Sequence, residues 1–396
     1  MLELRPYQNE GADFLVANKY ALLADAMRLG KSPQAIVAAH NLRAERVIVA
    51  CPAIATEQWR AEWRKWYDYL CAPIMPRLTI TSYDMLRRYP QKFLNRNYDI
   101  AIIDECHFAK NPDAKRTKWV YGKGGVAWHA DRVWALSGTP CPNHAGEIWA
   151  LAYTFGLTKL SYPDFLARYC YVDWITDRVL GNRRELMPEL MGIIKPIMLR
   201  RTRDQVMPQF KDILTFNQWN VNPLRGIDLN SDDPMLVDPE SRKEVALAKV
   251  PQMVEEITGN FTAGNYRKTV VFAWHIDPME KLVADLRKNG IPAAAIMGKT
   301  STSARKQIQA NMHGNGHGVV VIQIIVGGTA IDASFAQHGY FLELDYVPGN
   351  NEQAAHRLVN YQTGLPVTMD VMTWPGSKDS AVQRTIMRKV KGALFD

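Results

Sequence analysis

The chain alternates short apolar runs, rich in β-branched residues, with longer segments whose apolar positions recur at helical spacing. The apolar runs occupy residues 46–51, 78–82, 100–105, 133–138, 269–274, 293–298, 319–326, 340–345 and 367–374. Continuous apolar strands separated by helix-length segments are typical of parallel sheets that helices cover on both faces. The pattern therefore predicts an α/β protein.

The apolar runs form two groups. Between residue 150 and about residue 265 the strand-like runs stop, and the sequence contains aromatic, charged and proline residues. A chain of 396 residues is too long for one ordinary core, because domains typically hold ~100–200 residues. We predict a first lobe at residues 1–150, a helical insert and connector at 151–235, and a second lobe at 236–396.

The stretch LLADAMRLGKSPQAI, in the first lobe, resembles a phosphate-binding loop that has lost most of its glycines. Of the pattern GxxxxGK[ST], only Gly30, Lys31 and Ser32 match, and Asp25 stands where the first glycine is expected. An apolar stretch precedes the loop and a helical pattern follows it, with the proline in a first turn where it is tolerated. This order of strand, loop and helix directs backbone N–H groups at an anion.

Two carboxylates follow another predicted strand, in the stretch AIIDECH. We expect Asp104 to hold Mg²⁺ and Glu105 to orient or deprotonate the water that attacks a γ-phosphate. The alternative is a pair of solvated carboxylates. Their position after a buried strand, downstream of the GKS stretch, favours nucleotide hydrolysis.

The order of these motifs resembles superfamily 2 helicases, and more narrowly the Swi/Snf-type ATPases, which translocate on double-stranded DNA without separating its strands. The resemblance is carried by LRPYQNEGADFL, LADAMRLGKSPQ, DECHFAKNP, ALSGTPCPN, YPDFLARYC, LRRTRDQV, VVFAWH, IVGGTAIDASFA and LDYVPGNNEQAAHR. It spans residues 2–396. It implies two RecA-like lobes that bind ATP and Mg²⁺, in a compact member similar to the annealing helicases.

The resemblance also implies roles for individual residues. The catalytic set is Lys31, Asp104, Glu105 and Arg357, and the metal ligands are Ser32 and Asp104. The nucleotide contacts are Arg5, Gln8, Gly30, Lys31, Ser32, Gly328 and Gln353. The residues that couple hydrolysis to DNA binding are His107, Ser137, Gly138 and Thr139.

The residues expected to contact DNA are of types that are also common on ordinary surfaces and at helix caps. They are Thr56, Gln58, Ser82, Tyr83, Arg87, Lys110, Asn111, Gly298 and Lys299. Trp59, Trp63 and Trp66 fall on one helical face, and this spacing predicts core packing rather than stacking on bases.

Three positions depart from the family pattern. Arg28 stands where the family has glycine, and either strains the loop or points outward. Asn360 stands where motif VI has its second arginine, and Asp332 where motif V commonly has asparagine. Asparagine cannot replace a guanidinium at the transition state. Either Arg357 alone reaches the γ-phosphate, or hydrolysis is slow, or residue 360 is not the natural one.

Charge and composition change this picture little. A net charge of +8, from 48 basic and 40 acidic residues, favours a polyanionic partner, although many basic proteins bind no nucleic acid. No run approaches the ~20 apolar residues that cross a bilayer, and the first residues lack the layout of a signal peptide. The five cysteines show no CxxC spacing, which favours free thiols over zinc or disulfides. We expect a monomer in the cytoplasm or nucleus, not a secreted or membrane protein.

The function expected from these observations is an ATP-dependent translocase or remodeller of double-stranded or branched DNA. One alternative is a strand-separating DNA or RNA helicase of superfamily 2. The other is a weakly catalytic scaffold that binds ATP and DNA, which Arg28 and Asn360 make plausible.

Overall fold

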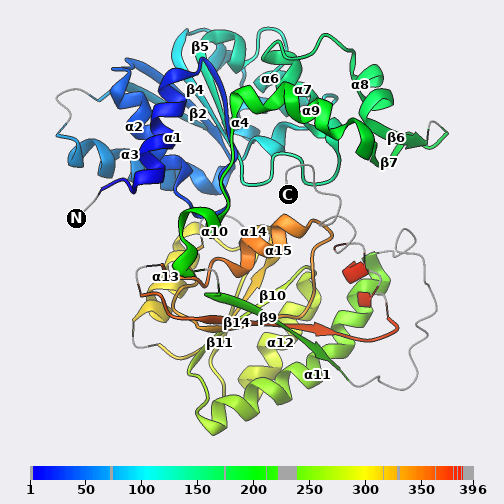
Figure 1. The fold of residues 1–396 in the computed structure, drawn as a ribbon. Helices are drawn as coiled ribbons and strands as arrows, with labels where there is room; N and C mark the ends of the chain where they lie inside the picture. Colours follow the sequence, from blue (N-terminus) through cyan, green and yellow to red (C-terminus); the bar gives the residue numbers. More distant parts are fainter. Residues whose placement is uncertain are drawn as a thin grey trace. The chain divides into compact units, whose positions relative to one another are not determined.

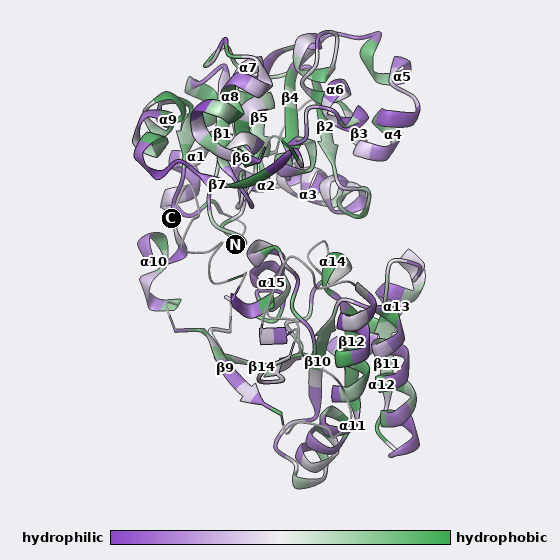
Figure 2. Cartoon of the chain, turned by 90° about the vertical axis from the view of Figure 1, so that its right-hand side faces the viewer, coloured by the Kyte–Doolittle hydropathy of each residue, from purple (hydrophilic) through white to green (hydrophobic). Residues whose placement is uncertain are grey.

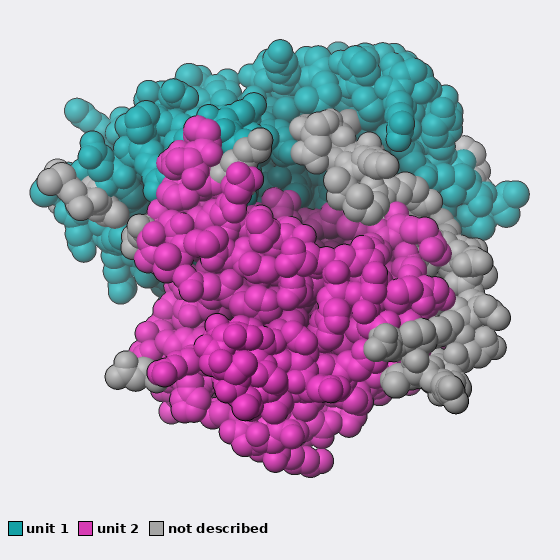
Figure 3. All heavy atoms as spheres, turned by 60° about the horizontal axis from the view of Figure 1, so that its bottom comes forward, with its two compact units in different colours: residues 1–206, 392–396 teal, residues 207–391 magenta. Residues whose placement is uncertain are grey.

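In the computed structural model, the described residues are 3–71, 75–173, 175–210, 212–221, 239–314, 316–327, 331–361, 363–377, 379–380, 382–384 and 386. They form two compact units, which Figure 3 colours separately. Lobe 1 is the unit of residues 1–206, and lobe 2 is the unit of residues 207–391.

Lobe 1 contains a parallel six-stranded sheet in the order β3-β2-β4-β5-β1-β8 (Figure 1). The strands are β1 (Tyr20–Leu23), β2 (Arg46–Cys51), β3 (Arg77–Ser82), β4 (Tyr98–Asp104), β5 (Ala130–Leu136) and β8 (Met198–Leu199). The helices are α1 (Pro6–Ala17), α2 (Lys31–Asn41), α3 (Thr56–Tyr69), α4 (Tyr83–Arg88), α5 (Gln91–Leu94), α6 (Lys115–Val120), α7 (Trp149–Thr154), α8 (Tyr162–Tyr169), α9 (Met187–Ile194) and α10 (Arg203–Val206). A two-stranded antiparallel hairpin, β6 (Cys170–Asp173) and β7 (Arg178–Asn182), stands outside the sheet.

Helices cover both faces of this sheet, and successive residues of a strand point to opposite faces. Leu22 and Ile103 pack into a core with α4 and α6 to α9. Their neighbours Leu23 and Ile102 pack into a second core with α1, α2 and α3. Figure 2 accordingly shows hydrophobic residues along β2 and β4.

Lobe 2 contains a second parallel six-stranded sheet, in the order β11-β12-β10-β13-β14-β9. The strands are β9 (Leu214–Asn220), β10 (Lys268–Ala273), β11 (Ala293–Ile296), β12 (Gly318–Gln323), β13 (His338–Phe341) and β14 (Val367–Thr373). The helices are α11 (Pro239–Ala263), α12 (Ile276–Lys288), α13 (Thr302–His313), α14 (Ile324–Gly327) and α15 (Pro348–Ala355). Val250, Met253 and Ile257 of α11 pack with Leu282 and Leu286 of α12 in one core.

The α/β fold with two lobes is confirmed, and every predicted apolar run overlaps a strand. The run at 319–326 continues past β12 into α14. Residues 151–206 belong to lobe 1, because α7, α8 and α9 bury their apolar faces against its sheet. Beyond residue 206 the chain supplies β9 to lobe 2, so the described part of the predicted insert is divided between the lobes. No helix in the described ranges is long and apolar enough to cross a membrane.

Candidate nucleotide-binding site

The loop between β1 and α2 forms a tight turn at the N-terminus of a helix. Gly30 precedes the first residue of α2 and has φ 76° and ψ 47°, in the left-handed region. A Cβ added to Gly30 would lie 2.3 Å from Gln8 Nε2, so a side chain there adds backbone strain and displaces the end of Gln8. The backbone of the loop therefore favours glycine at position 30, directly before the helix N-terminus, which is an end that favours anions.

Arg28 adopts a conformation that glycine favours. Its φ is 63°, in a region that costs a residue with a side chain of order 1–3 kcal/mol. The side chain is half-buried. The strained backbone that the sequence raised as one alternative is thus present, and the side chain does not project fully into solvent.

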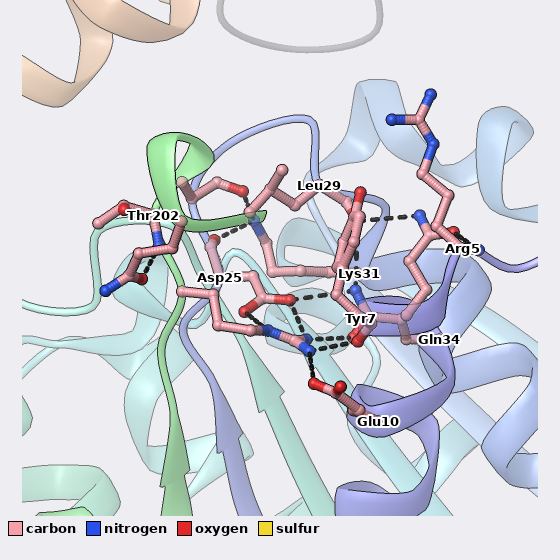
Figure 4. Close-up of polar contacts among 12 residues, drawn as sticks. Arg5, Tyr7, Glu10, Asp25, Leu29, Lys31, Gln34 and Thr202 are labelled. Carbon is pink, nitrogen blue, oxygen red and sulfur yellow. Dashed lines mark hydrogen bonds and ion pairs between the residues drawn. The ribbon is translucent and has the colours of Figure 1, made fainter. Parts of the chain in front are cut away.

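Lys31 bonds to the backbone of this loop (Figure 4), and Gln8 does so as well. Lys31 Nζ donates to Asp25 O at 2.8 Å and to Ala26 O at 3.3 Å. Gln8 Nε2 donates to Leu29 O at 3.0 Å, while its Oε1 accepts from Arg5 N at 2.9 Å. The predicted nucleotide residues of α1 and α2 are therefore brought together, with Arg5 exposed and Ser32 half-buried beside them.

Beneath the loop lies a buried ion pair that sequence reasoning missed. Asp25 is 0% exposed, and Arg201 grips its carboxylate with Nε at 2.9 Å and Nη2 at 2.6 Å. Arg201 Nη2 also donates to Gln34 Oε1 at 3.0 Å, and Gln34 Nε2 donates to Asp25 Oδ2 at 3.1 Å. Figure 4 shows Asp25 and Gln34 facing one another, with Tyr7 and Glu10 alongside. The guanidinium lies 5.4 Å from the Tyr7 ring centroid.

The backbone around Arg201 joins the sheet next to the loop. β8 pairs with β1 in parallel, and the ladder continues past both strands. Ala24 N donates to Leu199 O at 2.7 Å, and Ala26 N donates to Arg201 O at 2.9 Å. The segment that ends lobe 1 is thus fixed to the nucleotide loop by its main chain and by its arginine. The stretch LRRTRDQV carries this signal, but the motif alone does not reveal the partner of Arg201.

Asp104 and Glu105 occupy the carboxyl end of β4. Trp59 Nε1 donates to Asp104 Oδ2 at 2.7 Å, and the Tyr83 hydroxyl donates to Asp104 O at 2.6 Å. Burial and the neighbouring Glu105 raise the pKa of Asp104, whereas the Trp59 hydrogen bond and the charge of Lys31 lower it. The charge of Lys31 thus acts on the pKa of Asp104, and the sequence assigned both residues to one site.

The predicted coupling residues also meet. His107 Nδ1 lies 2.9 Å from Ser137 Oγ and 3.3 Å from Glu105 Oε2. Ser137 Oγ also accepts from Thr139 N at 3.2 Å. Burial and the nearby Lys110 lower the pKa of His107 to about 4, which keeps the imidazole neutral near pH 7. Gly138 is buried, and a Cβ there would lie 3.0 Å from a side-chain atom of the loop.

Four of the expected DNA contacts are occupied within lobe 1. Tyr83 is 4% exposed and packs against the Asp104 backbone, so its side chain is not open to a phosphate. Ser82 is also buried and caps α4 by accepting from Met85 N at 3.1 Å. Thr56 Oγ1 donates to a carbonyl of the preceding turn at 2.8 Å. Lys110 Nζ forms an ion pair with the buried Glu147 at 2.6 Å.

The other expected DNA contacts have exposed positions, namely Gln58, Arg87, Asn111, Gly298 and Lys299. In lobe 2, Gly298 N donates to Gln323 Oε1 at 3.0 Å, and Lys299 Nζ lies 2.8 Å from Glu280 Oε1. Gly298 and Lys299 are therefore already bonded to neighbouring side chains of lobe 2.

Two further predicted site residues of lobe 2 lie in and just after α15. Gln353 and Arg357 are half-buried, and Gly328 lies outside the described residues. Asn360 shapes a turn, since its main-chain O accepts from Gly364 N at 3.0 Å. Asp332 Oδ1 accepts from Ser334 N at 3.0 Å. Both residues that depart from the family pattern thus take part in local backbone structure.

The donor set of lobe 1 suits a nucleotide and a hard cation. A hydroxyl from Ser32 and a carboxylate from Asp104 are oxygen ligands of the kind that Mg²⁺ prefers. The close backbone approach at Gly30 and the N-terminus of α2 suit a phosphate.

Comparison with known protein families gives two matches. The SNF2-related domain matches residues 7–217, which is just over half of the chain, and the helicase conserved C-terminal domain matches residues 248–361. The chain belongs to the SNF2-related family. The Swi/Snf-type resemblance of its motifs is thereby confirmed, and the Asp25–Arg201 ion pair joins two ends of the SNF2-related domain.

Several SNF2-related proteins are similar over nearly the whole chain. The SWI/SNF-related matrix-associated actin-dependent regulator of chromatin subfamily A-like protein 1 of Bos taurus is 26% identical over 98% of this chain and 44% of that protein. The DNA annealing helicase and endonuclease ZRANB3 of Homo sapiens is 22% identical over 98% of this chain and 40% of that protein. The chain thus spans less than half the length of these relatives. The Sulfolobus solfataricus SWI2/SNF2 ATPase core in complex with dsDNA is 18% identical, with 99% of this chain and 92% of that chain covered and a TM-score of 0.47.

Proposed function

We propose that this chain is a DNA-dependent ATPase that couples ATP hydrolysis to movement along one strand of double-stranded or branched DNA. The observation that carries the proposal is the arrangement in lobe 1. A turn with glycine in the left-handed region opens α2 at Lys31, and at the end of β4 His107 lies beside both Glu105 and Ser137. The name of one relative, a DNA annealing helicase, supports DNA as the partner.

In this proposal the residues of lobe 1 divide the binding of ATP among them. Gln8 contacts the adenine. Lys31 leaves its hydrogen bonds to the loop carbonyls and bonds to the β- and γ-phosphates, and the N–H groups at the N-terminus of α2 donate to the phosphate oxygens. Glu105 orients the attacking water and accepts its proton. Ser32 and Asp104 hold Mg²⁺, which neutralises charge on the phosphate oxygens when it is bound. From lobe 2, Arg357 supplies the positive charge that stabilises the transition state.

Coupling to DNA runs in this proposal through the contact of His107 with Ser137. Because His107 also approaches Glu105, a shift of the Ser137 turn on DNA binding changes how the general base is held. The exposed residues Gln58, Arg87 and Asn111 of lobe 1 contact phosphates, which give affinity without sequence preference.

The test is ATP hydrolysis by the full chain with duplex DNA, forked DNA, single-stranded DNA and RNA side by side. Duplex or forked DNA should stimulate turnover most, and Lys31→Ala and Glu105→Gln should abolish it. Stimulation mainly by single strands or RNA would instead support a strand-separating helicase. Turnover no higher than that of Glu105→Gln on any nucleic acid would overturn the proposal in favour of a scaffold.

Movement is tested separately from hydrolysis by displacement of a third strand from a DNA triplex, which needs no separation of the duplex. The wild type should displace the third strand only with ATP. Hydrolysis stimulated by duplex DNA without displacement would remove the translocation part of the proposal and leave the ATPase part standing.

A further inference from the structure

One tryptophan of lobe 1 contacts the carboxylate that the proposed function assigns to Mg²⁺. Trp59 is 2% exposed, and its Nε1 donates a 2.7 Å hydrogen bond to Asp104 Oδ2. The Tyr83 hydroxyl holds the main chain of the same residue by a 2.6 Å bond to its carbonyl oxygen. The backbone and the side chain of Asp104 are thus both fixed by aromatic donors from other elements.

The position of Trp59 on α3 explains why this tryptophan reaches the site. β2 and β3 are parallel neighbours, so the helix that joins them runs back along the sheet and its first turn lies at the carboxyl edge. Trp59 belongs to that first turn, whereas Trp63 lies about 6 Å further along the axis at 1.5 Å per residue. Both side chains belong to the same core.

Trp63 provides an internal comparison. It is 0% exposed, yet its Nε1 has no hydrogen-bond partner among the described residues. Core packing therefore tolerates a tryptophan on this face whose N–H bonds to nothing. Burial alone explains the indole ring at both positions, but it does not explain the short bond from Trp59 to a carboxylate.

We propose that Trp59 is a positioning residue for the metal ligand. Its N–H holds one oxygen of Asp104, so that the carboxylate presents a single orientation to Mg²⁺. The inference rests on the proposed function, because it assumes that lobe 1 binds nucleotide with Mg²⁺. Donors that orient a metal ligand in this way change metal affinity by about 10–100-fold when they are removed.

The experiment measures the binding of a fluorescent N-methylanthraniloyl ADP to the full chain by anisotropy, as Mg²⁺ is titrated. Trp59→Phe keeps an aromatic ring and removes the N–H, and Trp63→Phe makes the same change where no hydrogen bond exists. Trp59→Phe should raise the Mg²⁺ concentration at half-maximal binding by about 10–100-fold. Trp63→Phe should leave it unchanged.

Further arms separate orientation of the ligand from loss of structure. In the Asp104→Asn background, Trp59→Phe should add no further change, because the two residues act as a pair. Binding of the nucleotide in EDTA should be the same in wild type and Trp59→Phe. If Trp59→Phe does not fold, replacing the Trp59 indole with benzothiophene keeps the shape and removes only the donor.

The outcomes distinguish the two proposals. A wild type that binds no nucleotide at any Mg²⁺ concentration would contradict the proposed function itself. A wild type that binds nucleotide, with the same Mg²⁺ requirement in Trp59→Phe as in Trp63→Phe, would overturn this inference alone. The inference also fails if wild-type affinity does not depend on Mg²⁺.

Discussion

Removing Arg201 should strongly destabilise lobe 1, although Arg201 lies 176 positions from its partner Asp25 in the sequence. In Arg201→Met the apolar stem of the side chain is approximately retained and the guanidinium is lost. Asp25 is 0% exposed, so its carboxylate would remain buried with Gln34 as its remaining side-chain donor. The carbonyl of Tyr7 and the side chain of Gln34 would each lose a donor as well.

The magnitude follows from the burial of both partners. Removing one partner of a buried ion pair costs about 3–5 kcal/mol, mostly because the other charge is left uncompensated. A domain of 150–250 residues loses about 2–4 °C of Tm per kcal/mol, and lobe 1 falls in this range. Arg201→Met should therefore lower the Tm of lobe 1 by roughly 6–20 °C.

The assay is differential scanning calorimetry of the full chain without nucleotide, with Arg168→Met as the matched control. Arg168 grips Glu189 with the same two-pronged geometry, at 2.9 and 2.7 Å, but this pair lies on the surface. Exposed ion pairs contribute little to stability. Adding Asp25→Asn to Arg201→Met should recover part of the loss, because it removes the buried charge. Equal Tm values for Arg201→Met and Arg168→Met would refute the reasoning.

Three further predictions follow from other buried or strained positions. Gly30→Ala should weaken ADP binding more than Gly156→Ala does. Both glycines have positive φ, but only a side chain at Gly30 would meet a neighbour, Gln8. Equal ADP binding by the two variants would contradict this. His107 has a pKa of about 4 against 6.5 for the ordinary group, so the folded state holds its imidazole neutral. The stability that the neutral imidazole contributes is therefore present above pH 6.5 and is lost as the pH falls toward 4. The urea midpoint of His107→Gln should therefore depend less on pH across that window than the wild-type midpoint, and parallel curves would count against it. Lys249→Met should destabilise lobe 2 by about 3–5 kcal/mol in urea unfolding, because Lys249 is 1% exposed and its Nζ bonds to a carboxylate and two carbonyls; a change below about 1 kcal/mol would show that water replaces these bonds.

How much of the fold could be predicted from sequence depended on where each strand lies in its sheet. β2, β4 and β12 lie inside their sheets and are covered on both faces, so their sequences are continuous apolar runs. β9 is an edge strand with the sequence LTFNQWN, and most of its residues are exposed. It therefore carries neither an apolar run nor a clear alternation. β8 is only two residues long, too short for any periodicity.

The site was predictable where its chemistry is local and unpredictable where it depends on distant partners. The spacing of Gly30 and Lys31, and the pair at 104–105, carry their roles in adjacent residues. Asp25 and Trp59 acquire theirs from residues 176 and 45 positions away. Motif position also gives no information on burial, which is why Tyr83 was expected at a DNA surface and lies in the core instead.

The two lobes place buried charge at the same end of their sheets and use it differently. In lobe 2, Glu343 follows β13 and accepts from the backbone N–H groups of Trp274 and His275, both at 2.9 Å. Lys249 bonds to the carbonyls of Leu342 and Met372 at this edge. These charges satisfy main-chain groups that the ends of parallel strands would leave unpaired in the interior.

In lobe 1, by contrast, the ion pair of Asp25 and Arg201 lies under a loop whose own Gly30 and Arg28 adopt left-handed conformations. A loop held in strained conformations needs support from its surroundings, and a buried, fully bonded pair supplies it without occupying the helix N-terminus above. The buried charges of lobe 1 thus support a strained loop, whereas those of lobe 2 satisfy the main chain at the ends of its strands.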